Sequence, residues 1–280
     1  MPTNPLGEFL RARRELLNPS DVGVRVTGVR RTPGLRREEV ATLAGISADY
    51  YLRLEQGRDR NPSRQVLEAV ARVLRLDAAG TDHLLSLVAA DHRAPRRRPR
   101  DVVPLGTRQL LDALGLPAFV EDRAFEVLAA NSLATALWPS LHVGQNRLRA
   151  VFLDERESAL VLDPEQARAG MVAAFRASVG AGTDDPRVAR LVGQLSLASA
   201  EFARLWARHD VRDLAGGTAR LQHPEVGLLE LRREKLAVGG TDGQLLVVYH
   251  AERGSASEQA LALLGSLALS RTPGVSAPGT

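Results

Sequence analysis

Residues 37–58 spell REEVATLAGISADYYLRLEQGR, a pattern typical of two short helices joined by a tight turn. Two helices that cross at a steep angle need a small side chain where they meet, and Ala41 supplies it. Gly45 can adopt the left-handed conformation that ends a helix. Ser47 follows as the N-cap of the second helix, with its hydroxyl in reach of an amide two or three residues on. The stretch is therefore predicted to be a helix-turn-helix.

The apolar spacing of this stretch separates a buried face from an exposed one. On the inward side of the two helices fall Val40, Ala44, Ile46, Tyr51 and Leu54. The outward side of the second helix then holds the residues expected to meet base edges in the major groove of DNA, namely Ser47, Ala48, Asp49, Leu52, Arg53 and Gln56. Arg53 is suited to guanine O6 and N7, and Asp49 to a cytosine amino group.

Basic and polar residues before and after the motif are expected to contact DNA phosphates. They are Arg30, Arg31, Arg36, Arg37, Arg58, Arg60, Asn61, Ser63 and Arg64. Ser63 is also the expected N-cap of the next helix, whose N-terminus favours an anion. Contacts of this kind fix the register of a protein on the duplex without reading its sequence.

Charge is unevenly distributed along the 280 residues, whose net charge is +4. Residues 1–100 hold 19 Lys and Arg against 12 Asp and Glu, whereas residues 101–280 hold 18 against 21. A basic first third favours a polyanion partner for that third alone. Together with the helical pattern, this charge favours double-stranded DNA over the alternative of a helical hairpin whose exposed arginines are merely solvated.

Composition limits the class of protein. Hydrophobic residues make up 44% and charged residues 25%, the balance of a globular chain, and the length suits two domains. No run approaches the roughly 20 apolar residues of a membrane span, and the N-terminus lacks a secretory pattern, so a cytoplasmic protein is expected. The absence of cysteine excludes disulfides, thiolate nucleophiles and cysteine-ligated zinc.

The chain is expected to divide at residues 92–106, where prolines and arginines indicate a linker. Before it, residues 1–91 show five short helical patterns and no strand pattern. After it, residues 107–270 mix helices with alternating segments, and a hairpin is predicted to join residues 229–238 to 245–250. Residues 271–280 are expected to form a flexible tail. Arg96–Arg98 in the linker is interpreted as solvated, with contact to DNA left open.

Residues 35–91 resemble the helix-turn-helix domain of the Xre and phage-repressor superfamily, and RRTPGLRREEVATLAGISADYYLRLEQGR resembles the MmyB-like regulators, common in actinobacteria. The resemblance continues through PAFVEDRAFEVLAANSLATAL, NRLRAVFLD, DDPRVARLVGQLSLASAEFARLWARHDVR, HPEVGLLELRREKLAV and QLLVVYHAERGSASEQALALL. It implies an all-α, five-helix, lambda-repressor-like N-terminal domain. It also implies a C-terminal α+β PAS-like domain that binds a fatty acid or a similar molecule, a ligand class that comes from the resemblance alone.

A pocket for such a ligand needs an apolar lining and a few polar groups. The expected lining is Phe125, Phe152, Phe202, Leu205, Trp206 and Tyr249, and the expected polar end is Asn131, Asn146, Arg149, His209 and Arg220. Core packing for each aromatic residue and a surface ion pair for each arginine remain open. The family commonly has tryptophan where this chain has Ala130 and Pro164, which implies a differently shaped or wider pocket.

The histidines of the second half do not form a catalytic or metal-binding pattern. His209, His223 and His250 come with no His-x-x-x-His spacing and no paired carboxylates, so neither catalysis nor a bound metal or other cofactor is expected. The sequence thus indicates a homodimeric regulator that binds an operator through residues 35–64 and responds to a small ligand. Two alternatives stay open: a C-terminal domain that only dimerises or docks a protein, and an enzyme tethered to DNA.

Overall fold

The structure is a computed structural model that describes residues 4–24, 34–59, 61–89, 102–180, 185–212 and 216–271. The chain packs into two compact units. The first combines residues 1–96 with 172–213, and the second combines residues 97–171 with 214–280. Helix α10 (Pro164–Val179) carries the chain from the second unit into the first. In the parts of the chain that are described, no helix has the length and apolarity that a bilayer span demands.

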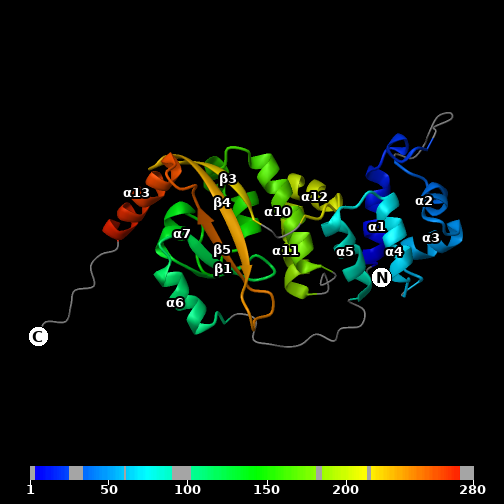
Figure 1. Ribbon diagram of the computed structural model, residues 1–280, viewed down its shortest axis with the longest axis horizontal. Coiled ribbons are helices and arrows are strands. Elements are labelled where there is room, and N and C mark those ends of the chain that lie inside the picture. The colour runs from blue at the N-terminus through cyan, green and yellow to red at the C-terminus, as the bar shows by residue number, and fades with distance from the viewer. Residues whose placement is uncertain are drawn as a thin grey trace, which may run out of the picture. The chain divides into compact units, whose positions relative to one another are not determined.

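The N-terminal part of the first unit is all-α, as predicted (Figure 1). It contains α1 (Pro5–Leu16), the 3-10 turn η1 (Pro19–Val22), α2 (Arg37–Ala44), α3 (Ala48–Glu55), α4 (Arg64–Val73) and α5 (Ala78–Ala89). These helices enclose one apolar core, in which Phe9, Tyr51, Leu54 and Val70 are almost fully buried. The five predicted helices are confirmed.

The rest of the first unit comes from a later part of the chain. It consists of the C-terminal half of α10, then α11 (Pro186–Ala198) and α12 (Ala200–Ala207). Asp185 and Ser199 cap the last two helices by accepting hydrogen bonds from backbone amides in their first turns. In sequence, this helical segment lies inside the range expected for the second domain.

The second unit is built on a five-stranded antiparallel sheet of order β2-β1-β5-β4-β3. Its strands are β1 (Ala118–Glu121), β2 (Val127–Ala130), β3 (Gly217–His223), β4 (Gly227–Ala237) and β5 (Leu245–His250). The predicted hairpin is confirmed, because β4 pairs with β5 up to the contact of Ala237 with Leu245.

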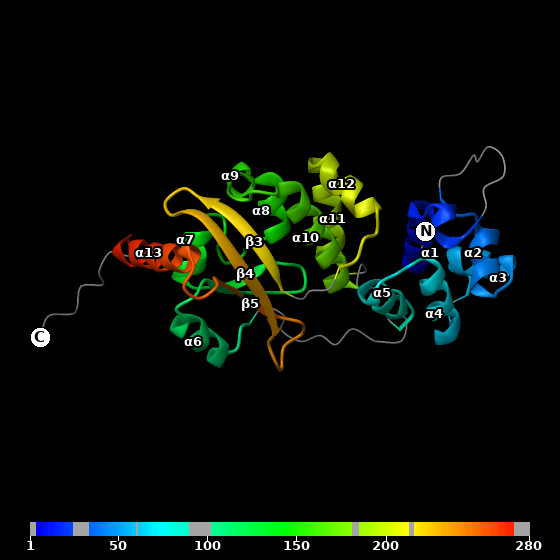
Figure 2. The ribbon, with the colours of Figure 1, turned by 45° about the horizontal axis from the view of Figure 1, so that its top comes forward.

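Helices cover both faces of this sheet. They are α6 (Leu105–Ala113), α7 (Ser132–Leu137), α8 (Arg147–Leu153), α9 (Glu155–Leu160) and α13 (Ala256–Arg271). One face, with Phe119 and Tyr249, forms the main core with α7, α9 and α13; Figure 2 shows α9 beside β3. The opposite face, with Val120 and Leu246, packs against Leu111 of α6. The α+β class is therefore confirmed for this unit.

Several elements were not predicted from the sequence. Strands β1 and β3 and the short helices α8 and α9 lie in segments without a regular pattern. Phe125 lies in the turn before β2 with φ of 61°, and Asp122 Oδ1 accepts hydrogen bonds from the amides of Ala124 and Glu126 in that turn. Apart from Arg271 at the end of α13, the predicted tail lies outside the described residues, as does most of the predicted linker, including Arg96–Arg98.

Candidate functional site

The α2–α3 pair has the helix-turn-helix geometry that the sequence predicts. Ala41 is 1% exposed at the packing point of α2, and Gly45 ends α2 with φ of 69°. Ser47 caps α3, and its Oγ accepts a hydrogen bond from the amide of Tyr50 at 3.1 Å. Val40, Tyr51 and Leu54 are fully buried, so the orientation of α3 about its own axis is fixed by packing.

This orientation leaves the predicted base-reading face of α3 accessible. Ser47, Ala48, Asp49, Arg53 and Gln56 are exposed, and Leu52 is half-buried. An exposed helix face with this mixture of donors, acceptors and two methyl-bearing residues can read base edges in a major groove. The fold therefore presents the six residues on one surface, while their contacts to bases stay a prediction.

Two of these residues interact with each other. Arg53 Nη1 lies 3.0 Å from Asp49 Oδ2 across one helical turn, and the Arg53 guanidinium lies 5.6 Å from the centre of the Tyr50 ring. Both partners are largely exposed, so the pair contributes little to stability. Its effect is to hold the guanidinium extended along the surface of α3.

The predicted phosphate contacts fall into three groups. The first group has exposed side chains before α2, between α3 and α4, or at the start of α4. Its members are Arg36, Arg58, Asn61, Ser63 and Arg64. Ser63 Oγ also accepts a hydrogen bond from the amide of Val66, the cap expected for α4, and Arg64 pairs with Glu68 at 2.7 Å. Arg30, Arg31 and Arg60 lie outside the described residues.

Arg37 forms the third group, because it has a structural contact. Its Nε donates to Glu55 Oε2 at 2.6 Å, while Arg14 Nε donates to Glu55 Oε1 at 2.6 Å. The Glu55 side chain is completely buried. Burial alone would raise the pKa of Glu55, but the hydrogen bonds and charges of Arg14 and Arg37 outweigh it and lower that pKa. Glu55 at the end of α3 therefore remains ionised and ties α1, α2 and α3 together.

The residues predicted for the ligand pocket divide between the two units. Phe202, Leu205, Trp206 and His209 belong to the first unit. Phe125, Asn131, Asn146, Arg149, Phe152, Arg220 and Tyr249 belong to the second. In the first group, Phe202 and Trp206 stack at 6.0 Å between ring centres and Leu205 is buried beside them. Their described contacts are those of helix packing.

Two of the polar residues expected in the pocket of the second unit serve as helix caps. Asn131 Oδ1 accepts from the amides of Ala118 and Ala134, and its Nδ2 donates to Leu116 O at 2.8 Å. Asn146 Oδ1 accepts from the first amides of α8, and its Nδ2 donates to Ala124 O at 2.7 Å. Both side chains therefore have structural partners.

The remaining predicted pocket residues differ in burial. Tyr249 and Phe125 are 4% and 2% exposed; Tyr249 packs on Trp138, and the Lys235 ammonium lies 4.4 Å from the centre of the Phe125 ring. Phe152 is half-buried beneath the Arg168 guanidinium. Arg149 and Arg220 are exposed. The Arg220 guanidinium lies within 3.6 Å of the carboxylates of Asp163 and Glu230.

A buried polar cluster in the second unit was not predicted. Arg147 Nη1 lies 2.9 Å from Glu157 Oε1, and the two side chains are 4% and 1% exposed. Ser140 Oγ donates to the same carboxylate oxygen, and the Arg147 guanidinium lies 5.0 Å from the centre of the Trp138 ring. Among the described residues, neither Glu157 Oε2 nor Trp138 Nε1 has a hydrogen-bond partner. We call these four residues the Arg147 cluster.

The Arg147 cluster lies against the main core of the second unit. Phe119, Tyr249 and Trp138 belong to that core, which lies between the sheet and helices α7, α9 and α13. A buried polar atom without a partner is costly, and such atoms are therefore uncommon. The cluster offers one acceptor, at Glu157, and one donor, at Trp138, inside an apolar environment. The only signal in the sequence is a basic and an acidic residue ten positions apart on two short helices.

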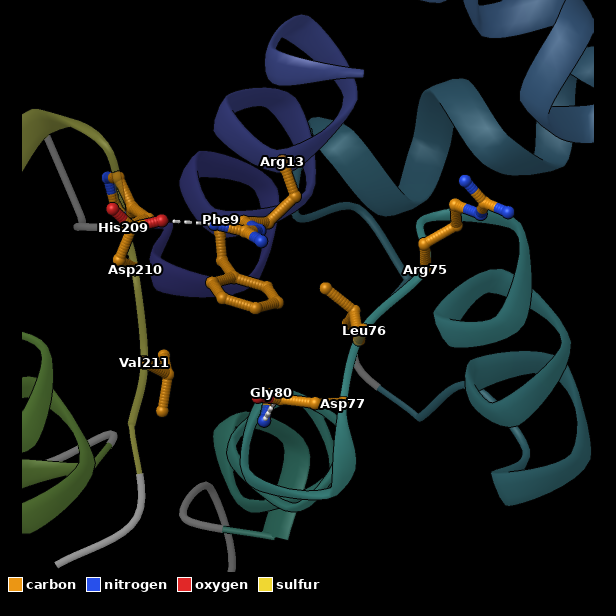
Figure 3. Close-up of a pocket in the computed structure, with 9 residues that line it drawn as sticks. All are labelled: Phe9, Arg13, Arg75, Leu76, Asp77, Gly80, His209, Asp210 and Val211. Carbon is orange, nitrogen blue, oxygen red and sulfur yellow. Dashed lines mark hydrogen bonds and ion pairs between the residues drawn. The ribbon is translucent and has the colours of Figure 1, made fainter. Parts of the chain in front are cut away.

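A cleft lies in the first unit, between α1, the α4–α5 connection and the chain that follows α12 (Figure 3). Its empty volume, including space open to solvent, is about 390 Å³, and its lining consists of Phe9, Arg13, Arg75, Leu76, Asp77, Gly80, His209, Asp210 and Val211. Arg13 Nη1 lies 2.5 Å from Asp210 Oδ1 across it. Figure 3 shows Phe9, Leu76 and Val211 directed into the space between these segments.

The histidines considered for catalysis have packing or surface roles in the described structure. His223 is 4% exposed; its Nε2 lies 3.1 Å from Ala136 O, and its Nδ1 accepts from the amide of Glu225. His250 Nε2 lies 3.9 Å from Glu234 at the surface, and His209 belongs to the first unit. Within the described ranges, no three His, Asp or Glu side chains group closely enough to hold a metal ion.

Comparison with known families gives two matches. Residues 5–84 match the model of a helix-turn-helix domain, and residues 103–264 match the model of the MmyB-like transcription regulator ligand binding domain. The second match covers more than half of the chain. A search of curated proteins finds no match. The second of these families is a domain of transcription regulators.

Proposed function

The chain belongs to the MmyB-like transcription regulators, and on this premise we propose that a small molecule in its second unit controls its affinity for an operator. Its DNA-binding domain is the helix-turn-helix of the first unit. The observation that carries the operator-binding part of the proposal is the exposed face of α3, which is held in place by a fully buried opposite face. The proposal concerns the bases read, the number of copies bound and the ligand.

On DNA, the six exposed or half-buried residues of α3 and its two caps meet base edges. Arg53 releases Asp49 and donates to guanine O6 and N7, and Asp49 accepts from a cytosine amino group on a neighbouring base pair. Because their ion pair is exposed, its loss costs little compared with the about 1–3 kcal/mol that a bidentate base contact contributes to discrimination. Arg36, Arg58, Asn61, Ser63 and Arg64 face the phosphates.

Two copies of the chain bind together. One recognition helix buries too little surface for a specific and tight complex, so regulators of this kind use two half-sites about 34 Å apart or a multiple of it. A homodimer supplies two α3 helices related by a two-fold axis. A ligand that changes the spacing of these helices changes operator affinity without touching the DNA.

The ligand is a small apolar or amphipathic molecule whose head group contacts the Arg147 cluster. Glu157 already balances the charge of Arg147, so a carboxylate head would place a second negative charge beside Glu157 in a buried environment. The atoms without partners, Glu157 Oε2 and Trp138 Nε1, suit a head group that both donates and accepts a hydrogen bond. A hydroxyl or primary amide does so, and these head groups rank above the carboxylate of a fatty acid.

Thermal unfolding of the full chain with decanamide, decanol and decanoate tests the ligand proposal. Decanamide and decanol should raise the Tm more than decanoate, because their head groups suit the Arg147 cluster better. A ligand at 100 times its Kd stabilises the folded state by about 2.7 kcal/mol. Trp138→Phe removes the indole N–H but keeps an aromatic ring, and it should reduce the shift, whereas Trp206→Phe, in the first unit, should leave the shift unchanged. A stronger shift with decanoate would place the head group beside another cation.

Operator binding in the presence of these compounds tests the regulatory step. A duplex selected by the protein should bind with a Kd that changes when decanamide or decanol is added and does not change in the Trp138→Phe variant. If none of the three compounds shifts either the Tm or the Kd, the second unit is a dimerisation or docking module.

A further inference from the structure

Residues 172–212 leave the second unit and return to it, yet they pack with the DNA-binding helices. The chain on either side of this segment, up to residue 171 and from residue 214, belongs to the second unit, whereas the segment belongs to the first. The amide of Arg212 donates to Ala173 O at 3.3 Å, which joins its two ends. We call residues 172–212 the strap. Both of its ends are therefore covalently continuous with the second unit, and the strap itself lies within residues 103–264, which match the ligand-binding family.

The end of the strap contacts α1 directly. Arg13 Nη1 lies 2.5 Å from Asp210 Oδ1, and Val211 packs against the apolar core of the helix-turn-helix domain. The Phe9 ring, 1% exposed, makes T-shaped contacts with two imidazoles, with ring centres 5.2 Å from His83 of α5 and 6.4 Å from His209 of the strap. Figure 3 shows Arg13 and Phe9 on the side of α1 that faces His209 and Asp210.

Arg176 fixes the shape of the strap at this contact. Its Nη2 donates to Trp206 O at 2.5 Å, its guanidinium lies 3.7 Å from the centre of the Trp206 ring, and its Nη1 lies 3.1 Å from His209 Nδ1. Burial lowers the pKa of Arg176 to about 10, so it remains charged at neutral pH and His209 Nδ1 is the acceptor. His209 has φ of 52°, a left-handed conformation that this bonding maintains.

The opposite side of α1 contacts the recognition helix. Asn4 Nδ2 donates to Glu55 O at 2.8 Å, and Arg14 Nε donates to Glu55 Oε1 at 2.6 Å. A Cβ built on Gly7 would lie 2.0 Å from Glu55 O, so the backbones of α1 and α3 are in close contact there. A displacement of α1 therefore reaches the C-terminal end of α3 with no intermediate side chain.

We propose that the strap couples ligand binding to DNA binding. When the strap is seated, meaning packed against α1, it holds α1 against α3, and it releases α1 when the second unit changes state. This regulation rests on the proposed function, because it needs a ligand that favours one state of the second unit. The seated strap is the state that binds the operator tightly. The contact tested below is the ion pair between Asp210 and Arg13, since this pair joins the strap to α1.

Affinity for a selected duplex tests the proposal with a matched pair of variants in the full chain. Asp210→Asn should weaken binding about five- to tenfold, because it unseats the strap. Loss of a negative charge by itself strengthens binding to DNA, so electrostatics predicts the opposite sign. Asp185→Asn removes the same charge elsewhere in the strap and keeps the N-cap of α11, and it should bind within about twofold of the wild type.

The charge swap Arg13→Asp with Asp210→Arg completes the design. Because Arg208 Nε also donates to Asp210 Oδ2 at 2.8 Å, the swap is made in an Arg208→Gln background, where it keeps the net charge and should bind within about twofold of Arg208→Gln alone. Tighter or unchanged binding by Asp210→Asn would overturn the proposal, as would a swap that recovers nothing. Far-ultraviolet circular dichroism confirms that each variant is folded.

Hydrogen exchange separates this proposal from the proposed function. In the absence of DNA, Asp210→Asn should speed the exchange of amides in α1 and of the Glu55 amide, whereas Asp185→Asn should not. If the wild-type protein binds no duplex, the proposed function fails, and hydrogen exchange alone then tests whether the strap holds α1 in place. Equal exchange of α1 in both variants would overturn it.

Discussion

Arg14 of α1 and Glu55 of α3 form an ion pair that solvent does not reach, with Arg14 Nε 2.6 Å from Glu55 Oε1 and side chains 7% and 0% exposed. Arg37 of α2 contacts the other carboxylate oxygen. Three helices of the DNA-binding domain therefore meet at one buried charge. Such a site stabilises the fold only while it is complete, because each charge left alone in the interior is costly.

Glu55→Gln should destabilise the first unit by about 3–5 kcal/mol, since it leaves two arginines without their carboxylate. Urea unfolding followed by Trp206 fluorescence, in a Trp138→Phe background, reports this unit specifically. Glu68→Gln is the matched control, because its pair with Arg64 is exposed and should contribute at most about 1 kcal/mol. Equal losses in the two variants would show that the buried pair has no special role.

Two helical glycines should respond with opposite signs to the same substitution. Gly7→Ala places a Cβ 2.0 Å from Glu55 O and should cost about 3 kcal/mol, because backbone has to move. Gly193→Ala in α11 meets nothing within 4 Å and should stabilise the unit by about 1 kcal/mol through helix propensity. The same fluorescence assay measures both. A stabilising Gly7→Ala would contradict the close contact of α1 with α3.

Arg53 and Arg58 should differ in what they contribute to DNA binding. Arg53→Ala is expected to relax discrimination at one base pair by about 1–3 kcal/mol. Arg58→Ala is expected to weaken binding to all duplexes alike and to lower the slope of log K against log salt by about 1. Arg58 is preferred to Arg37 here, because Arg37 also supports Glu55. Parallel effects in the two variants would mean that another face of α3 reads the bases.

Acid should destabilise the first unit through two buried histidines. Burial and the charge of Arg176 lower the pKa of His83 to about 4. The same two causes, with smaller effects of His83 and Arg13, lower the pKa of His209 to about 3, although Asp210 opposes them. The unfolded chain takes up these protons near pH 6.5, so between about pH 6.5 and pH 4 it binds more protons than the folded chain. The free energy of unfolding therefore falls as the pH is lowered in this window.

The expected slope is up to about 1.4 kcal/mol per pH unit for each histidine. His83→Gln should remove about that amount from the slope of unfolding free energy between pH 6 and pH 4.5. His142→Gln, at an exposed position of the second unit, should leave the slope unchanged. Identical slopes in His83→Gln and the wild type would show that His83 is not held neutral.

The helix-turn-helix was predictable from sequence because its signals are local. Ala41, Gly45 and Ser47 each act within one turn of their own position, and the structure confirms all three. Strand β1 was missed because all four of its residues are buried, so it lacks the alternation that marks a half-exposed strand. Strand β3 begins at a glycine and exposes polar residues, which gives little signal.

The buried charges were not predictable, because each depends on partners far along the chain. Glu55 meets Arg14 across 41 positions, and Arg13 meets Asp210 across 197. Asn131 and Asn146 show the converse: as isolated letters they suggest ligand groups, but the structure gives both a capping role. The strap had no sequence signal, since its helices have the ordinary amphipathic pattern of core helices.

Selection of duplexes from a random library by the full-length protein at low salt tests the central claim, that the exposed face of α3 reads DNA. We expect enrichment of a motif present in two copies, about 34 Å or a multiple of it apart, with one guanine preference that disappears when the selection is repeated with Arg53→Ala. An unenriched pool, or a motif that Arg53→Ala leaves intact, would contradict it.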